Sequence, residues 1–488
     1  MSTEVADVQL PVSRKFDLIK DSLLQHDDLP LADVIDCDHW QAVFDQHGID
    51  FGADDDSVYT PAITLWALIS QAFFKAEMRS CKAAVSRVAA LWATQGNRIC
   101  STNTGAYCRA RAKISWEAVR DICSHVAASA EELFDDRDTE YDEQTHGVVA
   151  EVRAKPISGR VMLVDGFTVT AADTEANQKA YPQNSAQKPG IGFPIIRGVS
   201  LISMVTGLLV TLKLGPYAGK QSGETWLLWQ MLGQLEAGDT LVADCFYCTY
   251  WLIAACKNKG VHIVMKNHDK RNDDPVGATR ISQHERTTVW LKPPCPNWMS
   301  DEDYAAMPEK IEVRLVDVVI DQAGFRSKKY TIATTVLDNR VYTRSWIASV
   351  YRSRWLIELD IRSIKCSLNM DIVRAKTPAM VRTEIWSCLL AYNLIRFKML
   401  QSASSCERMP RSLSFTATQQ SLASTWLLAC VTATPELIQM SLGNSASQTV
   451  GLRPDRIEPR ANKRRKKRIA LLTKPRHLAR LQLLNSGS

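Results

Sequence analysis

Two short apolar runs, each followed directly by an aspartate, constrain the fold of this chain most. Residues 161–164 (Val-Met-Leu-Val) end at Asp165, and residues 240–243 (Thr-Leu-Val-Ala) end at Asp244. Short apolar runs between turn-forming residues are typical of buried strands. In an open α/β sheet, a carboxylate at the carboxyl end of such a strand lies where these sheets carry their sites. Taken singly, either aspartate is more often a turn or helix-capping residue.

Four polar residues on one expected helix point to the same chemistry: Tyr351, Arg354, Glu358 and Lys365. At about 100° per residue they fall within a stripe roughly 60° wide, beside a stripe of Ile and Leu that we expect to be buried. A phenol, two cations and a carboxylate in one line are able to hold a metal ion and a phosphodiester together. The alternative is a solvated helix with an i, i+4 ion pair between Arg354 and Glu358.

The two strands and the helix can bring Asp165, Asp244 and Glu358 to one point. Three clustered carboxylates repel one another unless cations compensate, and two divalent metal ions about 3.5–4 Å apart would do so. We therefore expect the three acids to be catalytic and to bind two Mg²⁺ ions, for which Mn²⁺ would substitute.

The helical spacing Tyr-x2-Arg-x3-Glu-x6-Lys resembles the signature of the insertion-sequence transposases of the IS-four type, which are DDE enzymes with an RNase H-like core. Asp165 in Val-Asp-Gly-Phe-Thr matches the first acid of that family, Asp244 in Ala-Asp-Cys-Phe-Tyr the second, and Glu358 the third. The resemblance runs from about residue 70 to residue 480. Cys245 departs from it, because many relatives carry arginine after the second acid.

The resemblance implies a DNA transposase working by cut and paste, with metal-dependent cleavage at the element's ends, a hairpin intermediate and strand transfer to target DNA. It implies double-stranded DNA as the partner, namely the terminal inverted repeats and the target, and a homodimer that pairs two ends. Tyr351 would donate a hydrogen bond to phosphate, and Arg354 and Lys365 would offset phosphate charge. The alternatives are an RNase H-like nuclease and a domesticated DNA-binding regulator without strand transfer.

Composition indicates an ordinary soluble protein, with 45% hydrophobic and 23% charged residues among 488. No secretory signal is visible, and the apolar stretch at 199–214 is interrupted and too short to span a membrane. Thirteen cysteines without a framework spacing indicate a reducing cytoplasm, and we expect a bacterial, nucleoid-associated protein. Cys245 and Cys248 have CxxC spacing, but no second ligand pair follows, so we expect no zinc site.

Charge is distributed unevenly along the chain. Residues 1–60 hold 14 acidic and 3 basic residues, whereas residues 453–480 hold 12 basic and 2 acidic residues. The basic end is the electrostatic footprint of a nucleic-acid contact, and the acidic start is either a solubilising face or an arm that limits nonspecific DNA binding. The residues of the densest basic run are Lys463, Arg464, Arg465, Lys466, Lys467 and Arg468.

Two further segments are candidates for DNA contact. The helical block at 61–150 carries Arg109 and Arg111 just after a helix start, which suits a helix presented to DNA or, alternatively, a bundle with a solvated basic face. The separation of 114 positions between Asp244 and Glu358 is too long for one loop, and strand-like runs within it predict a β-rich insertion. Its Trp290 and Trp298 would stack on a flipped base, or else are core or edge tryptophans.

The expected fold is α/β: an RNase H-like mixed-sheet core interrupted by a β-rich insertion, with a helical N-terminal domain and a basic C-terminal region. Residues 401–425 are rich in serine and are expected to be looped. The expected boundaries are 1–60 for the acidic arm, 61–150 for the helical DNA-binding domain, 151–266 and 344–400 for the two parts of the core, 267–343 for the insertion, and 401–488 for the C-terminal region.

Overall fold

The structure is a computed structural model that divides into two compact units. Unit 1 comprises Met1–Asp135, Ser363–Met370 and Ala379–Val450, and unit 2 comprises Asp136–Arg362, Asp371–Pro378 and Gly451–Ser488. The residues that the structure describes are 37–52, 57–94, 100–133, 159–219, 222–268, 271, 278–320, 328–404, 406, 408–432, 440, 443–450 and 473–485. Among these, no helix has the length and apolar character needed to cross a membrane.

Unit 1 consists of helices and short turns in its described part, apart from one isolated bridge, and the described residues of the predicted helical block at 61–150 that lie in this unit are helical or in short turns. The helix α3 begins where the Thr60 side chain accepts a hydrogen bond from the Ile63 backbone N–H, and Pro61 occupies the first helical position, which is a favourable start. The helix α14 is buried along most of its length. The helices are α2 (Cys37–Gln46), α3 (Pro61–Phe73), α4 (Cys81–Thr94), α5 (Thr104–Arg111), α6 (Trp116–Leu133), α14 (Pro378–Ser404) and α15 (Phe415–Thr432).

The loop predicted at 401–425 was wrong. The helix α14 continues to Ser404 and α15 begins at Phe415. Tertiary packing outweighs the serine content there, because the buried Gln419 side chain donates its Nε2 to the carbonyl oxygens of Phe73 at 3.0 Å and of Ser367 at 3.2 Å.

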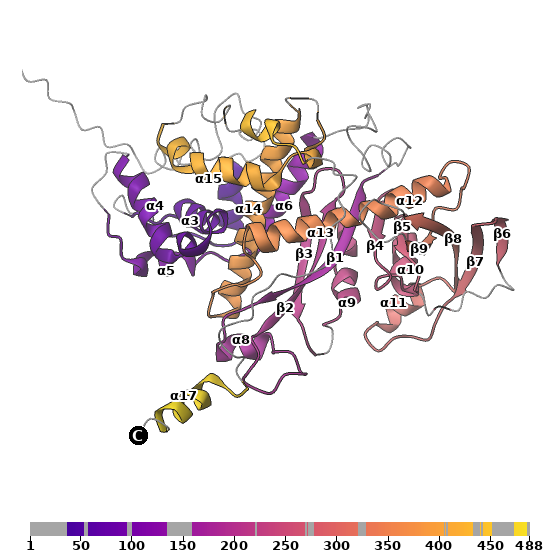
Figure 1. Ribbon diagram of the computed structural model, residues 1–488, viewed down its shortest axis with the longest axis horizontal. Helices are drawn as coiled ribbons and strands as arrows, with labels where there is room; N and C mark the ends of the chain where they lie inside the picture. Colours follow the sequence, from indigo (N-terminus) through magenta and orange to yellow (C-terminus); the bar gives the residue numbers. More distant parts are fainter. Residues whose placement is uncertain are drawn as a thin grey trace, which may run out of the picture. The chain divides into compact units, whose positions relative to one another are not determined.

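Unit 2 is built on one nine-stranded sheet in the order β3-β2-β1-β4-β5-β9-β8-β7-β6 (Figure 1). The pairs β1–β4 and β4–β5 are parallel and all other neighbours are antiparallel, so the sheet is mixed, as predicted. The strands between the second and third acids extend the same sheet through the β5–β9 pair. The strands are β1 (Val161–Thr170), β2 (Ile195–Ser203), β3 (Leu209–Pro216), β4 (Thr240–Ala243), β5 (His262–Lys266), β6 (Thr279–Ser282), β7 (Glu285–Leu291), β8 (Lys310–Ile320) and β9 (Lys328–Thr334).

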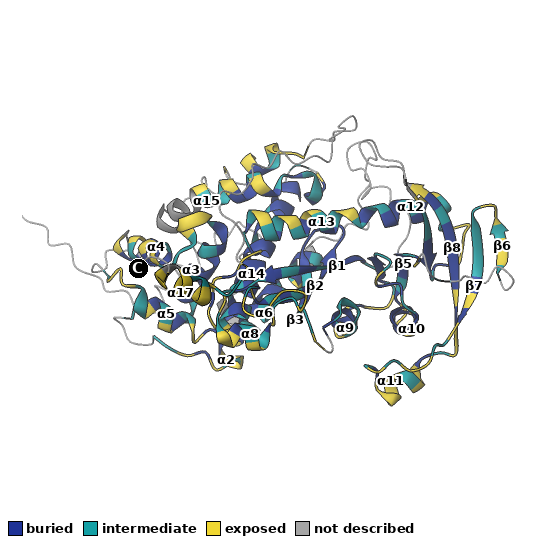
Figure 2. Ribbon diagram, turned by 60° about the horizontal axis from the view of Figure 1, so that its bottom comes forward, coloured by how far each residue is buried: buried dark blue, intermediate teal, exposed yellow. Residues whose placement is uncertain are grey.

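Helices cover the two faces of this sheet (Figure 2). On one face, α9 and α10 share a hydrophobic core with Met162 and Val164 of β1. On the other face, α12 packs on β4, β5 and β8, and α13 packs on β1. Because side chains alternate along a strand, Asp165 projects toward the face of α12 and α13. The helices of unit 2 are α8 (Glu175–Ala180), α9 (Glu224–Trp229), α10 (Tyr250–Asn258), α11 (Asp301–Ala306), α12 (Arg344–Ser353), α13 (Trp355–Arg362) and α17 (Arg476–Asn485).

The strand expected to end at Asp165 is longer than predicted. β1 continues to Thr170 because its second half pairs with β2, from Gly166 opposite Val199 to Thr170 opposite Ile195. β4, in contrast, ends at Ala243, directly before Asp244, as predicted.

The single helix expected to carry the polar stripe is interrupted. Arg354 separates α12 from α13, and residues Ser363–Ser367 form a π-helical turn. Because a π turn holds more residues than an α turn, the 100° spacing does not extend to Lys365. Lys365 belongs to unit 1, whereas Tyr351, Arg354 and Glu358 belong to unit 2.

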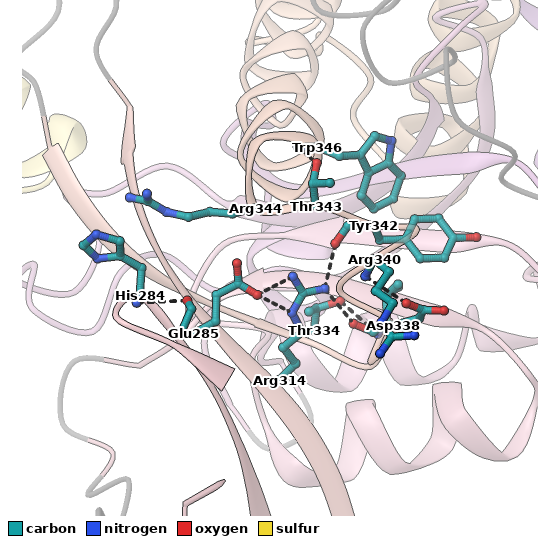
Figure 3. A network of polar contacts seen from close by, with 12 residues as sticks. His284, Glu285, Arg314, Thr334, Asp338, Arg340, Tyr342, Thr343, Arg344 and Trp346 are labelled. Atoms are coloured by element: carbon teal, nitrogen blue, oxygen red, sulfur yellow. Dashed lines mark hydrogen bonds and ion pairs between the residues drawn. The ribbon is translucent and has the colours of Figure 1, made fainter. Parts of the chain in front are cut away.

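A buried ion pair fixes the start of α12 (Figure 3). The Arg314 side chain, on β8, is fully buried and its Nη2 lies 2.6 Å from Oε2 of Glu285 on β7. Its Nη1 donates to the carbonyl oxygen of Tyr342 at 2.8 Å, just before the Thr343 side chain caps α12. Arg344 in the first turn donates its Nε to the carbonyl oxygen of Asp317 at 2.7 Å. The helix that leads to Arg354 and Glu358 is therefore anchored on β7 and β8.

Candidate active site

Strand register brings the first two acids to the same level. In the parallel β1–β4 pair, Val161 lies opposite Thr240 and Leu163 opposite Val242. Asp165 and Asp244 each follow two residues later, so the two carboxylates leave neighbouring strands side by side.

A salt bridge at the other end of these strands sets that register. Asp239 is nearly fully buried, and its Oδ1 accepts the backbone N–H of Arg160 at 2.9 Å. Its Oδ2 lies 2.8 Å from Nη2 of Arg160. Because Arg160 precedes β1 and Asp239 precedes β4, this pair aligns the beginnings of both strands.

The Asp165 carboxylate is held in a mostly buried position. Its side chain is 24% exposed, its Oδ1 accepts the Gly166 backbone N–H at 2.8 Å, and its Oδ2 lies 3.9 Å from Nη1 of Arg354. Burial raises the pKa of Asp165 to about 6, against the lowering effects of the Gly166 N–H and of Arg354. The carboxylates of Asp244 and Glu358 add to the rise. The second and third predicted acids therefore both act electrostatically on the first.

Arg354 connects two of the acids. Its Nη2 donates to Oε1 of Glu358 at 2.7 Å, which is the i, i+4 ion pair of the alternative interpretation. The same guanidinium also reaches Asp165 on β1, so the pair belongs to a larger cluster. Burial lowers the pKa of Arg354, but Tyr351, Glu358 and Asp165 together raise it above its ordinary value.

Tyr351 lies on the same side of the sheet, close to the second acid. Its ring is buried and its centroid is 5.7 Å from that of Tyr330 on β9. Burial raises the pKa of the phenol, Arg354 lowers it, and Tyr330 and Asp244 raise it further. Asp244 itself caps the turn after β4, where its Oδ1 accepts the Phe246 backbone N–H at 2.8 Å. The structure thus brings together five of the predicted residues: Asp165, Asp244, Tyr351, Arg354 and Glu358.

The carboxylate oxygens of this cluster are suitable ligands for a divalent cation, although the acids are not arranged as a complete metal site. Over the described residues, no group of three or more His, Cys, Asp or Glu side chains is arranged to hold a metal ion. The guanidinium of Arg354 stands between Asp165 and Glu358, which accounts for their separation. The three acids nevertheless offer only carboxylate oxygens, the ligands that Mg²⁺ prefers.

The two candidate tryptophans are packed against the protein. Trp290 is 9% exposed in the core of unit 2, and the guanidinium of Arg271 lies 3.7 Å from the centre of its ring. Trp298 packs edge-on against Trp226 at 5.7 Å and Trp229 at 5.3 Å. These are the surroundings of core and edge tryptophans, and stacking on a DNA base stays a prediction that would require either ring to leave its packing.

The remaining predicted DNA contacts lie elsewhere. In unit 1, Arg109 is exposed at the end of α5, whereas Arg111 is half-buried with its guanidinium 5.7 Å from the ring centre of Tyr107. Tyr107 is fully buried and donates its hydroxyl to Gln71. The basic run at 463–468 lies outside the described residues.

Sequence reasoning missed Glu224 and Tyr247. The Tyr247 hydroxyl donates to Oε2 of Glu224 at 3.0 Å, and the Glu224 carboxylate lies against Gly166, next to the first acid. Gly166 could have indicated such a contact in the sequence, since a glycine inside a strand often marks a close approach of another group.

Known proteins resemble the part of the chain that carries this cluster. The family model described as the Transposase DDE domain matches residues 156–394, which include the three acids. The Escherichia coli (strain K12) transposase InsG for insertion sequence element IS4 is 24% identical over 259 residues, 52% of this chain and 56% of that protein. The putative transposase InsL for element IS186A and the Escherichia coli transposase for element IS421 are each 32% identical over 77 residues, 21% of either protein. The chain therefore spans about half the length of the first relative and about a fifth of the other two.

Proposed function

We propose that this chain is a DNA transposase that moves an insertion sequence by cut and paste, because residues 156–394 match the family model described as the Transposase DDE domain. The observation that carries the proposal is the convergence of Asp165, Asp244 and Glu358 from two strands and a helix on one side of the sheet. A structural ion pair does not need acids from three separate elements, whereas a site for two divalent metal ions uses several carboxylates in this way.

The three acids would hold two Mg²⁺ ions, which when bound activate a water for attack on the phosphodiester and stabilise the leaving 3′ oxygen. With a pKa of about 6, the Asp165 carboxyl is mostly ionised at neutral pH and available as a ligand. Mn²⁺ would substitute, since it accepts the same oxygen donors.

Arg354 and Tyr351 would act on the DNA backbone. The forked donors of Arg354 already face two carboxylates, and the same donors suit a phosphate held between them. The raised pKa of Tyr351 keeps its phenol protonated at neutral pH. This favours a role as hydrogen-bond donor to phosphate and argues against a role as a phenolate nucleophile.

The freed 3′-OH would then attack the opposite strand, giving a hairpin, and later the target DNA. The partners would be the terminal inverted repeats, the target duplex and a second copy of the chain that pairs the two ends. Lys365, Arg109 and Arg111, and the basic run at 463–468 would add phosphate contacts, which supply most of the affinity in such complexes. The domain boundaries predicted from the sequence, including the helical DNA-binding domain at 61–150 and the β-rich insertion at 267–343, are part of this proposal.

The test is a cleavage and joining assay on linear DNA that carries the element's ends. We expect Mg²⁺-dependent cuts at both ends and, with target DNA added, joined products; DNA with shuffled ends is the control. Cuts without joined products would favour an RNase H-like nuclease. Binding of the ends without any cut in Mg²⁺ or Mn²⁺ would favour a DNA-binding regulator and would overturn the proposal.

A further inference from the structure

A fourth carboxylate lies behind the acid cluster, on the opposite face of the sheet. Glu224 is the first residue of α9, which packs on the face of the sheet that carries Met162 and Val164. Asp165 projects from β1 toward the other face. Glu224 therefore lies on the side of α9 and α10, and the backbone of β1 separates it from the Asp165 side chain.

Glu224 touches the strand of the first acid at one residue. A Cβ atom built on Gly166 would overlap the Glu224 carboxylate, so only glycine leaves room for this carboxylate against β1. The backbone N–H of Gly166 donates to Oδ1 of Asp165 at 2.8 Å. The carboxylate of Glu224 thus packs against Gly166, the residue whose backbone N–H donates to the Asp165 carboxylate.

Glu224 also holds the turn of the second acid. Its Oε2 accepts the hydroxyl of Tyr247 at 3.0 Å, and Tyr247 is fully buried three residues after Asp244. Burial raises the pKa of Tyr247, and the charges of Glu224, Asp165 and Asp244 raise it further, which keeps the hydroxyl protonated as a donor.

A third contact fixes the carboxylate from the side of β2. Nε of Arg197 lies 3.8 Å from Oε1 of Glu224, and Nη1 of Arg197 donates to the Ser222 carbonyl oxygen at 2.9 Å. The Arg197 guanidinium also lies 4.6 Å from the ring centre of Tyr217. Arg197 is therefore itself held in place and offsets the charge of Glu224.

We propose that Glu224 is a positioning residue that sets the distance between the first and second acids, by resting on Gly166 and by holding Tyr247. The proposal rests on the function proposed above, because the distance matters only if Asp165 and Asp244 share metal ions. Glu224 lies behind β1, so its role is to act through Asp165 and Asp244.

The test compares variants in single-turnover cleavage of pre-bound DNA ends, with Mg²⁺ titrated. Glu224→Ala and Tyr247→Phe should each slow cleavage about 10- to 100-fold and raise the Mg²⁺ concentration for half-maximal rate. The double variant should be no slower than Glu224→Ala alone, because both changes remove the same hydrogen bond. Glu224→Gln should retain most of the rate, since its amide oxygen accepts the same hydrogen bond.

Variants at Gly166 give a second, independent test of the proposal. Gly166→Ala should slow cleavage in the wild-type background because its methyl group displaces the Glu224 carboxylate. In the Glu224→Ala background the same change should cost much less. The matched control is Glu309→Ala, which removes a largely exposed carboxylate of the same unit that pairs with Lys292 at 2.9 Å.

Two further measurements separate positioning from stability and from the proposed function. If Glu224→Ala lowers the melting temperature but leaves both the cleavage rate and the Mg²⁺ midpoint unchanged, the positioning role is overturned. Calorimetric titration with Mn²⁺ does not depend on cleavage: weaker Mn²⁺ binding by Glu224→Ala supports the proposal even if wild type cuts no DNA. Equal Mn²⁺ affinity in both proteins would contradict it.

Discussion

The acid cluster should make the protein less stable than a variant without one of its charges. Burial and two neighbouring carboxylates raise the pKa of Asp165 from 3.8 to about 6. The folded state therefore holds a proton on this group at pH values where the unfolded chain has released it. Stability should fall as the pH rises from about 4 to about 6 and then stay constant. Asp165→Asn should remove this effect, because an amide carries no charge to bury.

The size of the effect follows from the shift. Each pKa unit corresponds to about 1.4 kcal/mol, so a rise of about two units implies roughly 3 kcal/mol against folding above pH 6. This shift already includes the attraction between Asp165 and Arg354, which lie 3.9 Å apart. We therefore expect Asp165→Asn to be more stable than wild type by about 3 kcal/mol at pH 8 and by nearly nothing at pH 4.

The assay is urea unfolding followed by circular dichroism across this pH range, with a chelator present so that no divalent ion screens the cluster. Asp173→Asn is the control, since Asp173 is an exposed carboxylate of the same unit. A variant that is destabilised at pH 8, or whose advantage does not change between pH 4 and pH 8, would refute the reasoning.

Three other perturbations test separate parts of the account. Arg354→Ala removes a group that lowers the pKa of Asp165, so that pKa should rise further and the acid limb of the cleavage pH–rate profile should move to higher pH; an unmoved limb would contradict this. Arg314→Ala breaks the buried ion pair with Glu285 and should lower the free energy of unfolding by about 3–5 kcal/mol. The control Arg286→Ala should lower it by less than about 1 kcal/mol, because its partner Asp317 is 44% exposed. Equal losses in urea titrations would contradict this. Deleting residues 453–488 should weaken binding to all DNA sequences. The slope of log K against log salt concentration should become shallower by about 0.9 for each phosphate that the segment neutralises. An unchanged slope would show that this segment does not touch DNA.

Local patterns predicted the elements that carry the acids. The apolar runs before Asp165 and Asp244 predicted β1 and β4, because short buried strands are determined by their own side chains and flanking turns. The polar stripe predicted that Tyr351, Arg354 and Glu358 share one side, since they lie within two turns of each other across a single interruption at Arg354.

Contacts between distant segments could not be predicted in this way. The π turn that separates Lys365 from the stripe is held by tertiary packing, as in the hydrogen bond from Gln419 to Ser367. Trp290 packs in the core of unit 2 and against Arg271, which comes from a different segment. Glu224 escaped notice because its partners lie on β1 and after β4, and nothing around it in the chain marks it as polar support for a site.

The central claim is that Asp165, Asp244 and Glu358 form one metal-dependent site for DNA cleavage. Its most direct test is single-turnover cleavage in Mg²⁺ of element ends already bound by Asp165→Asn, Asp244→Asn or Glu358→Gln. Each variant should retain most of its affinity for the ends, because Lys and Arg contacts dominate binding, and each should lose cleavage. Cleavage near the wild-type rate by any one of the three would remove that residue from the site and contradict the account.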